Sequence, residues 1–414
     1  MRILITSIGS YGDVYPFIAI AQELKRRDHD VILFINEHYK PHAAAAGLNA
    51  VSVWSADVYD RAIRHPMAWD QKRGIRYLLN TLSSHITDIY EILDKYFVPG
   101  ETLIIGSTLA FSSRILQDKY NVPGVTVHLS PSVLRSSYES PLITDNHHIN
   151  RIPKTIKRGL WWLVDTLVAD PTIKPQINKL RTFLGLKPVK RIFDQWLHSP
   201  DLVVGLFPAW FSSPQPDWPP QVVCTAFPLY DEGVGYELPQ EIINFIHSGD
   251  PPVVFTPGTA MTQGEQFFKE SIAACAKLDN KRAILLTRYP EQIPKSLPDN
   301  IRHYDYIPLS SLLPHAGVLV HHGGIGTCSQ AFKAGVPQLI RPMAYDQFDN
   351  ANRIIKLGAG LSISTDHYQA AKIATTIEML LQPQHKKKCQ EVSAKFCGDN
   401  PIVTTCDLIL SVVE

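Results

Sequence analysis

The N-terminal segment changes from a strand-like to a helix-like pattern of apolar positions. Residues 2–6 are a short apolar run, and residues 7–15 are a glycine-containing loop. Pro16 follows as the expected first residue of a helix, a position where proline is favoured. Apolar side chains then recur at helical spacing as far as Leu24. A second apolar run at 30–35 completes a strand–helix–strand unit, whose two strands we expect to be parallel.

The same alternation continues along the chain and starts afresh after residue 228, with residues 228–239 as the expected linker. Helices are expected at 266–278 and 329–334. Further strands are expected at 103–105, 125–129, 202–207, 253–255, 283–287, 318–320 and 338–340. The pattern predicts the α/β class, with two doubly wound, Rossmann-like domains that face an interdomain cleft.

Two segments depart from this rhythm. Residues 140–195 are rich in proline, histidine and basic side chains and contain Trp161-Trp162. We expect them to form a helical insertion over the mouth of the cleft. Residues 401–414 have a mostly apolar helical pattern, which predicts a C-terminal helix.

Composition narrows the class of protein. Lys and Arg number 40 against 39 Asp and Glu, a balance that argues against a nucleic-acid partner. No apolar run approaches the roughly 18 residues that span a bilayer, and the first residues lack an apolar signal region. The six cysteines form no CxxC pair and no metal-ligand spacing, which favours reduced thiols and a cytoplasmic location.

A glycine-rich turn follows the strand expected at 318–320. Residues 321–327 read His-His-Gly-Gly-Ile-Gly-Thr and open a helix. Glycines let the backbone approach a ligand, and the amides at a helix N-terminus favour an anion, so the turn suits a diphosphate. Thr327 as a simple helix cap, with two ordinary loop histidines, remains the alternative. The absence of GxxxxGK[ST] argues against a P-loop.

Asp346-Gln347 follows this turn by nineteen residues. A neighbouring carboxylate and amide can take several hydrogen bonds from vicinal hydroxyls, which is what a sugar offers. A helix cap or a surface pair is the alternative interpretation.

Together, these spaced motifs resemble the donor signature of nucleotide-sugar glycosyltransferases with the GT-B fold. The motifs are Pro308 with Leu312-Leu313-Pro314, His321-x-Gly323-Gly324-x-x-Thr327, Gly335-Val336-Pro337, Pro342 and Asp346-Gln347. The chain is similar to the UDP-glycosyltransferase family, which includes plant and animal transferases and bacterial antibiotic, sterol and rhamnolipid transferases. The resemblance implies an acceptor-binding domain over 1–228, a donor-binding domain over 229–400, and a helix over 401–414 that returns to the first domain.

The resemblance also implies roles for the matching residues. The diphosphate would be contacted by His321, Gly323, Gly324, Gly326 and Thr327, and by the turn Gly258-Thr259. The sugar would be held by Asp346 and Gln347. The nucleotide base would stack on Tyr306 and contact the backbone of Ile307, although many relatives have Trp at the position of Tyr306.

In the first half, the loop with Gly9, Ser10 and Gly12 leads to Asp13, which matches the catalytic aspartate of bacterial relatives. Asp13 would accept the proton of the attacking acceptor hydroxyl, and a single displacement implies inversion. A free Asp, with a pKa of about 3.9, is a weak base, but desolvation raises the pKa. The alternative is that Asp13 only caps the helix. No metal and no cofactor are expected, because His321 and the helix amides would stabilise the departing diphosphate in place of a divalent ion. Asp28-His29-Asp30 has the DxD pattern of metal-dependent transferases, but it lies at the wrong edge of the sheet.

One branch of the family fits residues 8–18, 190–200, 206–211 and 346–351 best: the catalytic B chain of the rhamnosyltransferase of bacterial rhamnolipid synthesis. It implies transfer of L-rhamnose from TDP-rhamnose to a 3-(3-hydroxyalkanoyloxy)alkanoate, which forms a glycolipid. The alternative is a UDP-glucose-dependent transferase acting on a sterol, polyketide or flavonoid. In both alternatives the expected partners are a TDP- or UDP-sugar donor and a hydrophobic acceptor that carries a hydroxyl group.

The basic and aromatic stretch from Arg151 to Trp162 has no acidic residue. It would either rest on an anionic membrane, peripheral to the inner face of the plasma membrane, or pack its tryptophans into the core. A nucleotide-sugar epimerase, a dinucleotide-dependent dehydrogenase and a non-catalytic sugar-nucleotide-binding module are the rival functions. For the transferase, we expect the two halves to move about the linker near residue 230, because a closed cleft excludes water.

Overall fold

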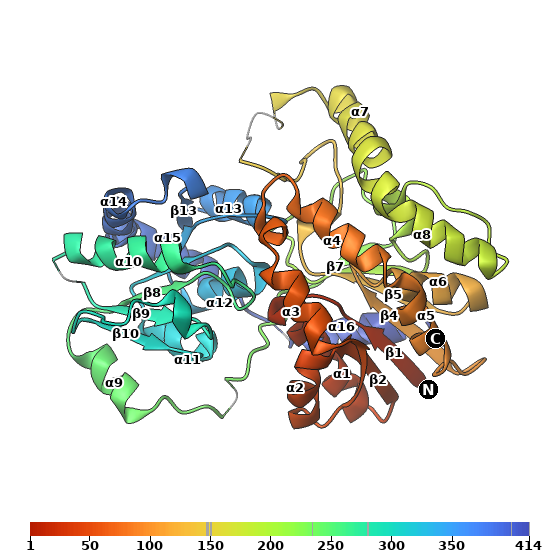
Figure 1. The fold of residues 1–414 in the computed structure, drawn as a ribbon, viewed down its shortest axis with the longest axis horizontal. Helices are drawn as coiled ribbons and strands as arrows, with labels where there is room; N and C mark the ends of the chain where they lie inside the picture. Colours follow the sequence, from red (N-terminus) through yellow and green to blue (C-terminus); the bar gives the residue numbers. More distant parts are fainter. Residues whose placement is uncertain (146–148, 150, 234, 280, 399, 414) are drawn as a thin grey trace. The chain divides into compact units, whose positions relative to one another are not determined.

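The structure, a computed structural model, describes residues 1–413 except 146–148, 150, 234, 280 and 399 (Figure 1). The chain forms two compact units. Unit 1 comprises Met1–Leu142, Asn146–Pro228 and Asp399–Glu414, and unit 2 comprises Ile143–Asp145 and Leu229–Gly398.

Unit 1 is built on a parallel sheet. The part of it that the structure describes has seven strands in the order β3-β2-β1-β4-β5-β6-β7. Their bounds are β1 Arg2–Thr6, β2 Asp30–Asn36, β3 Asn49–Trp54, β4 Thr102–Ser107, β5 Gly124–His128, β6 Leu202–Gly205 and β7 Val222–Cys224. The helices are α1 Tyr11–Arg26, α2 Lys40–Ala45, α3 Ala56–Arg64, α4 Gly74–Ser83, α5 Ile86–Asp94, α6 Phe111–Tyr120, α7 Lys154–Val164, α8 Asp170–Phe183 and α16 Pro401–Leu410.

Unit 2 repeats this plan with a smaller parallel sheet. Its described residues form six strands in the order β10-β9-β8-β11-β12-β13. Their bounds are β8 Val253–Thr256, β9 Ala283–Leu286, β10 Ile301–Tyr304, β11 Val318–His321, β12 Gln338–Ile340 and β13 Gly360–Ser362. The helices are α9 Gln240–His247, α10 Glu265–Lys277, α11 Leu309–Leu312, α12 Ile325–Ala334, α13 Gln347–Lys356, α14 Ala370–Leu380 and α15 Pro383–Ser393.

The two sheets confirm the predicted α/β class with Rossmann-like units. In unit 2, alternate residues of β8, β9 and β11 belong to two separate cores, because successive side chains of a strand point to opposite faces. Phe255 and Val320 pack with residues of α10 and α14, whereas Val254 and Leu319 pack with residues of α9 and α12. Both faces of the sheet are therefore covered, as the continuous apolar strands require.

The predicted start of the first helix was wrong. α1 begins at Tyr11, so Pro16 lies inside the helix and the expected loop is shorter. The missed signal is the capping pair Ser10 and Asp13, which fixes the first turn. Pro16 has no N–H to donate to the carbonyl of Gly12, and Gly12 is exposed at the helix surface.

Much of the segment 140–195 is helical, although residues 146–148 and 150 within it lie outside the described part. α7 continues through a π-helical segment, η5 (Asp165–Ala169), into α8. A second π turn, η6 (Ile192–Trp196), follows. None of the helices in the described part of the chain combines the length and apolar character needed to span a bilayer.

Candidate active site

The turn after β11 presents the start of α12. Gly324 is the N-cap, and the first hydrogen bond of the helix runs from the Cys328 N–H to the Gly324 carbonyl, 3.0 Å apart. The backbone N–H groups of Ile325, Gly326 and Thr327 therefore precede the first helical bond. Gly326 is exposed and Thr327 is half-buried. This arrangement leaves backbone N–H groups at the start of α12, a geometry that suits an anion.

The His321 side chain is already hydrogen-bonded within unit 2. It is fully buried, its Nε2 lies 3.1 Å from Gln338 Oε1, and its Nδ1 accepts a hydrogen bond from the Gly323 N–H at 3.2 Å. Both ring nitrogens are thus used inside unit 2, and burial lowers the pKa of His321 to about 3. This placement departs from the diphosphate contact that the family resemblance implied for His321.

His322, which is the variable position of the family motif, lies beside the start of α12. A β-carbon added to Gly324 would overlap its ring, and one on Gly258 would come within 2.8 Å of it. The ring therefore contacts both glycine turns. Its Nδ1 is buried and has no hydrogen-bond partner among the described residues, and burial lowers the pKa of His322 to about 4. A buried polar atom without a partner requires an explanation, of which a missing ligand is one.

The turn Gly258-Thr259 follows β8, the strand next to β11. Gly258 has a φ of +103°, a conformation that L side chains rarely adopt. Thr259 is exposed. Gly258 and Gly324 were predicted to approach the same phosphates, and the structure brings both against one imidazole.

Asp346 and Gln347 stand at the start of α13, after the strained turn residue Tyr345 with a φ of +60°. Gln347 Oε1 accepts hydrogen bonds from the N–H groups of Met343 and Ala344, at 2.8 and 3.1 Å. Asn350 Nδ2 donates to Asp346 Oδ2 at 2.8 Å. The Gln347 amide therefore has its oxygen engaged in the loop, and its nitrogen is the end left to donate.

This pair lies close to the glycine-rich turn. Asn350 Nδ2 also donates to the Gly323 carbonyl at 2.9 Å. A β-carbon on Gly323, whose φ is +96°, would come within 3.2 Å of the Gln347 carbonyl oxygen. The two motifs that are nineteen residues apart in sequence are thus in contact.

Tyr306 and Ile307 follow β10. Ile307 is buried, and the half-buried Tyr306 ring has the Arg288 guanidinium 4.8 Å from its centroid. Arg288 was not singled out from the sequence, because its position depends on the neighbouring strand β9. Burial lowers the pKa of Arg288 and raises that of Tyr306. The guanidinium lies over the ring as a cation–π pair.

In unit 1, Asp13 lies in the first turn of α1, beyond the carboxyl end of β1. Its Oδ2 accepts hydrogen bonds from the Ser10 N–H at 2.7 Å and from Ser10 Oγ at 3.0 Å. Gly9 has a φ of +146°, and a β-carbon there would overlap the carboxylate; Gly12 is exposed. Burial raises the pKa of the Asp13 carboxyl, while the bonds from Ser10 lower it. The Asp13 carboxylate therefore caps α1 and also has a raised pKa, which makes it a stronger base.

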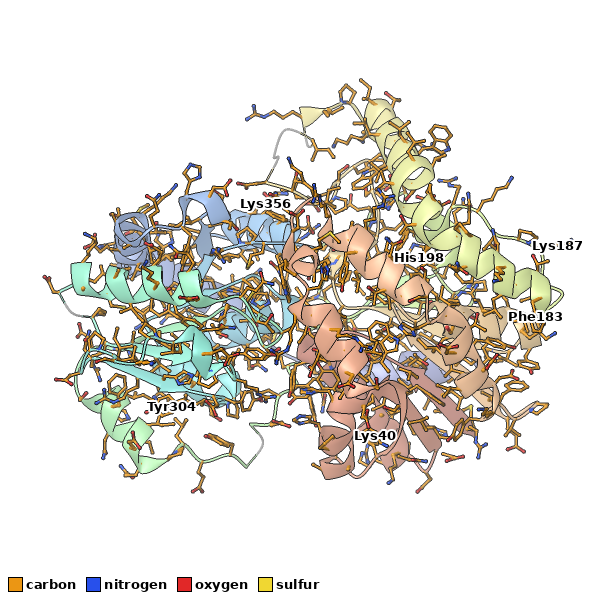
Figure 2. The ribbon with its side chains drawn as sticks, viewed as in Figure 1. Lys40, Phe183, Lys187, His198, Tyr304 and Lys356 are labelled. Atoms are coloured by element: carbon orange, nitrogen blue, oxygen red, sulfur yellow. The ribbon has the colours of Figure 1, made fainter. Side chains whose placement is uncertain are left out.

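A chain of buried polar groups lies at the same edge of this sheet. Thr108 Oγ1 is 2.9 Å from His128 Nδ1, and His128 Nε2 is 3.0 Å from His198 Nδ1 (Figure 2 labels His198). Burial lowers the pKa of His198 to about 4 and that of His128 well below its ordinary value. No spacing in the sequence indicates this contact, since seventy residues separate the two histidines.

A second polar and aromatic group borders the loop that carries Gly9. Asn36 Nδ2 donates to the Gly9 carbonyl at 3.0 Å. Beyond it, the Tyr11 hydroxyl lies 3.2 Å from His38 Nε2 and 3.3 Å from His42 Nε2. Burial lowers the pKa of His38.

Asp28-His29-Asp30 lies at the amino end of β2, where Asp30 accepts a hydrogen bond from Arg2 Nε at 2.8 Å. This is the opposite edge of the sheet from Asp13, as predicted. Within the described part of the chain, no group of three or more His, Cys, Asp or Glu side chains is arranged to hold a metal ion.

Comparison with known proteins covers both halves. Residues 3–138 match the glycosyltransferase family 28 N-terminal domain, and residues 269–404 match the C-terminal domain of erythromycin biosynthesis protein CIII-like proteins. The chain is 26% identical to the O-mycaminosyltylonolide 6-deoxyallosyltransferase of Streptomyces fradiae, over 99% of this chain and 97% of that protein. It is 23% identical to a sterol 3-beta-glucosyltransferase of Arabidopsis thaliana, over 98% of this chain and 67% of that protein.

Among solved structures, the glycosyltransferase VinC in complex with dTDP has the same fold, with a TM-score of 0.71 and 18% identity over 100% of this chain and 99% of that chain. The match of both halves, in the same order and over the whole length of a curated relative, agrees with the two sheets described above. The chain is therefore a nucleotide-sugar glycosyltransferase of the GT-B fold, whose two halves are similar to the family 28 N-terminal domain and to the EryCIII-like C-terminal domain.

Proposed function

We propose that this glycosyltransferase moves a hexose, L-rhamnose from TDP-rhamnose, to a hydroxyl of a hydrophobic acceptor such as a 3-(3-hydroxyalkanoyloxy)alkanoate, with inversion and without a metal. One observation carries the donor part of the proposal. The start of α12 and the unpartnered Nδ1 of His322 lie together between two glycine turns. This is a site for a diphosphate, because backbone N–H groups, the helix dipole and an imidazole all favour an anion.

In the proposed donor complex, His322 rather than His321 contacts the diphosphate. Thr327, Gly258 and the backbone of Gly326 complete the phosphate contacts. Asp346 and the Gln347 amide hold the sugar hydroxyls, and Tyr306 with Arg288 stacks on the nucleotide base. The support is that Gly323, Asn350 and Gln347 join the phosphate turn to the sugar turn through direct contacts.

In the proposed reaction, the acceptor oxygen attacks the anomeric carbon while its proton passes to the Asp13 carboxylate. The bond from the anomeric carbon to the phosphate oxygen breaks, and the nucleoside diphosphate leaves with the electron pair. Burial of Asp13 raises its pKa and so makes it a better base. The α12 amides and His322 stabilise the departing diphosphate, so no step requires a metal ion.

The choice of donor and acceptor rests on the branch resemblance and on the named relatives. The branch resemblance favours rhamnose and a hydroxyacyl lipid, whereas the curated relatives named above are a macrolide-type 6-deoxyallosyltransferase and a sterol glucosyltransferase. A UDP-glucose-dependent transferase acting on a sterol, polyketide or flavonoid is therefore the second candidate. The 6-deoxyhexose of the macrolide-type relative favours a 6-deoxy sugar over glucose.

The test is mass spectrometry of products from a grid of donors and acceptors with EDTA present. The donors are TDP-rhamnose, UDP-glucose and UDP-N-acetylglucosamine; the acceptors are a hydroxyalkanoyloxyalkanoate, a sterol and a flavonoid. We expect a rhamnosylated hydroxyacyl lipid from the wild type. Transfer only to the sterol or flavonoid would favour the second candidate, and an unchanged donor mass would point to an epimerase.

The role of Asp13 is tested in the same assay with Asp13→Asn. We expect kcat to fall by about 10²–10⁴ while the affinity for nucleoside diphosphate is kept. Asp28→Asn is the matched control, because Asp28 has a φ of +61°, which Asn tolerates, and lies at the other edge of the sheet. Full activity of Asp13→Asn would exclude Asp13 as the base.

A further inference from the structure

α7 is held to unit 1 by a narrow stripe of side chains. Only Lys157 and Trp161 of its described residues are buried, and Asp165 continues the stripe on the next turn. The Trp161 Nε1–H donates to Ser140 Oγ at 3.3 Å. The rest of the helix surface is therefore open, which is unusual for a helix that carries many large apolar residues.

The open side of α7 is apolar. Ile156, Leu160 and Leu163 follow one another at i, i+4 and i+7, so they lie on one face, and they are 53%, 39% and 44% exposed. Trp162, Leu167 and Val168 widen this face and are 53%, 64% and 49% exposed. We call these six residues the α7 surface. A contiguous exposed apolar face of this kind marks an interaction site.

The charges around the α7 surface are mainly positive. Residues 151–193 contain ten Lys and Arg, of which Arg181 pairs with Asp118 and Arg191 with Asp194, both outside this range. The range itself contains two acidic residues. Both acidic side chains are buried and engaged. Asp165 pairs with Arg135, and Asp170 accepts hydrogen bonds from the N–H groups of Arg191 and Ile192, each at 3.0 Å.

The same character continues along α8. Figure 1 shows α7 and α8 as one continuous helical rod, and Figure 2 labels Phe183 and Lys187 near its far end. Phe183 is 86% exposed. Because Asp165 and Asp170 are both buried, no acidic side chain of residues 151–193 faces solvent beside the lysines and arginines.

We propose that the α7 surface binds an anionic lipid bilayer, with α7 lying in the interface, its apolar face inserted and its basic residues on the lipid headgroups. An amphipathic helix with Lys and Arg beside Trp and Leu is suited to this position. A second copy of the chain is a poorer occupant, since self-association would bring two basic regions together. The bilayer would then lie beside unit 1, the half that the family resemblance implies binds the acceptor; this link to a lipid acceptor rests on the proposed function.

The experiment is co-sedimentation with phosphatidylcholine vesicles that contain either no charged lipid or 30% phosphatidylglycerol. We expect at least tenfold tighter binding to the anionic vesicles, lost in high salt, because each basic residue near the surface adds about 1 kcal/mol, roughly fivefold. Leu160→Ser and Leu167→Ser should each weaken binding about tenfold. Arg158→Glu should weaken it by a similar factor.

Matched controls use exposed side chains of unit 2. Met379→Ser on α14 removes an exposed apolar residue, and Lys387→Glu on α15 reverses an exposed charge; neither should change vesicle binding. Equal binding to neutral vesicles, no binding to anionic vesicles, or full binding by Leu160→Ser would each overturn the proposal. A dimer in light scattering that Leu160→Ser dissociates would assign the surface to self-association instead. The assay needs neither donor nor acceptor, so its failure is distinguishable from failure of the proposed reaction.

Discussion

His321 and His322 are neighbours in sequence, yet their side chains have different environments. His321 is the last residue of β11, and its side chain points to the same face as Gln338 of β12, which binds it. His322 lies beyond the strand, and its ring contacts Gly258 and Gly324. The sequence identified the glycine-rich turn but could not assign the two imidazoles, because the assignment depends on where the strand ends.

Two single substitutions separate these roles. His322→Ala should weaken binding of dTDP by about tenfold to hundredfold, because a hydrogen bond to a charged group is worth about 1.5–3 kcal/mol. Its free energy of unfolding should change little. His321→Ala should instead destabilise unit 2 by about 3 kcal/mol, since Gln338 Oε1 and the Gly323 N–H lose their partner. Isothermal titration calorimetry and thermal unfolding measure the two effects.

The opposite pair of results would support the role that the family motif implies, in which His321 contacts the diphosphate. If His321→Ala kept the fold and lost dTDP binding, while His322→Ala bound dTDP normally, the diphosphate contact would belong to His321. Gln338→Ala is a useful companion, because it removes the same buried hydrogen bond from the other side. It should reproduce the loss of stability of His321→Ala.

At the scale of elements, the apolar runs predicted the central strands well. β1 and β12 have the predicted bounds, and β8, β9 and β11 differ from prediction by one residue at an end. The edge strands β3, β7, β10 and β13 were not predicted. An edge strand pairs with only one neighbouring strand and is often short or polar. Its pattern of apolar and polar residues therefore resembles that of a loop.

The site was predictable to the extent that it follows from local rules. Glycines after a strand are a local signal, so Gly324 could be placed from sequence. Ser10 and Asp13 were identified through the family resemblance, and their pairing at the start of α1 was not predicted. Arg288 could not be placed beside Tyr306 from sequence, because that contact arises from the pairing of β9 with β10.

The buried histidines of unit 1 connect β5 to the segment after η6 and make stability depend on pH. The pKa of His198 is about 4 in the folded chain, against about 6.5 for a free histidine. Between pH 6.5 and 4 the unfolded state therefore binds more protons, and the free energy of unfolding falls as the pH falls. Each histidine of the pair contributes up to about 1.4 kcal/mol per pH unit.

Tryptophan fluorescence during urea unfolding measures this effect in unit 1, because all seven tryptophans belong to that unit. His198→Asn should reduce the slope of stability against pH in this range. His65→Asn, a change at an exposed histidine of the same unit, should leave the slope unchanged. An unaltered slope in His198→Asn would mean that His198 does not titrate differently in the folded and unfolded states.

At the scale of the whole molecule, the chain passes from unit 1 to unit 2 and returns. The main passages lie at residues 228–229 and 398–399, so unit 2 is flanked in sequence by parts of unit 1. The returning segment forms α16, which packs on α1. Arg27 of unit 1 pairs with Asp407 at 2.6 Å, and Arg27 Nη2 donates to the Val403 carbonyl at 3.2 Å. The last residues of the chain are thus part of the first unit.

This topology predicts that the C-terminus stabilises unit 1 rather than unit 2. Removal of residues 400–414 should lower the free energy of unfolding of unit 1 by at least about 4 kcal/mol, because Ile402, Cys406 and Ile409 are buried and α1 loses its cover. Tryptophan fluorescence during urea unfolding reports this loss. Removal of residues 411–414 alone spares α16 and is the matched control. An unchanged fluorescence transition after the longer truncation would show that α16 contributes little, and that unit 1 folds from the residues before 229 alone.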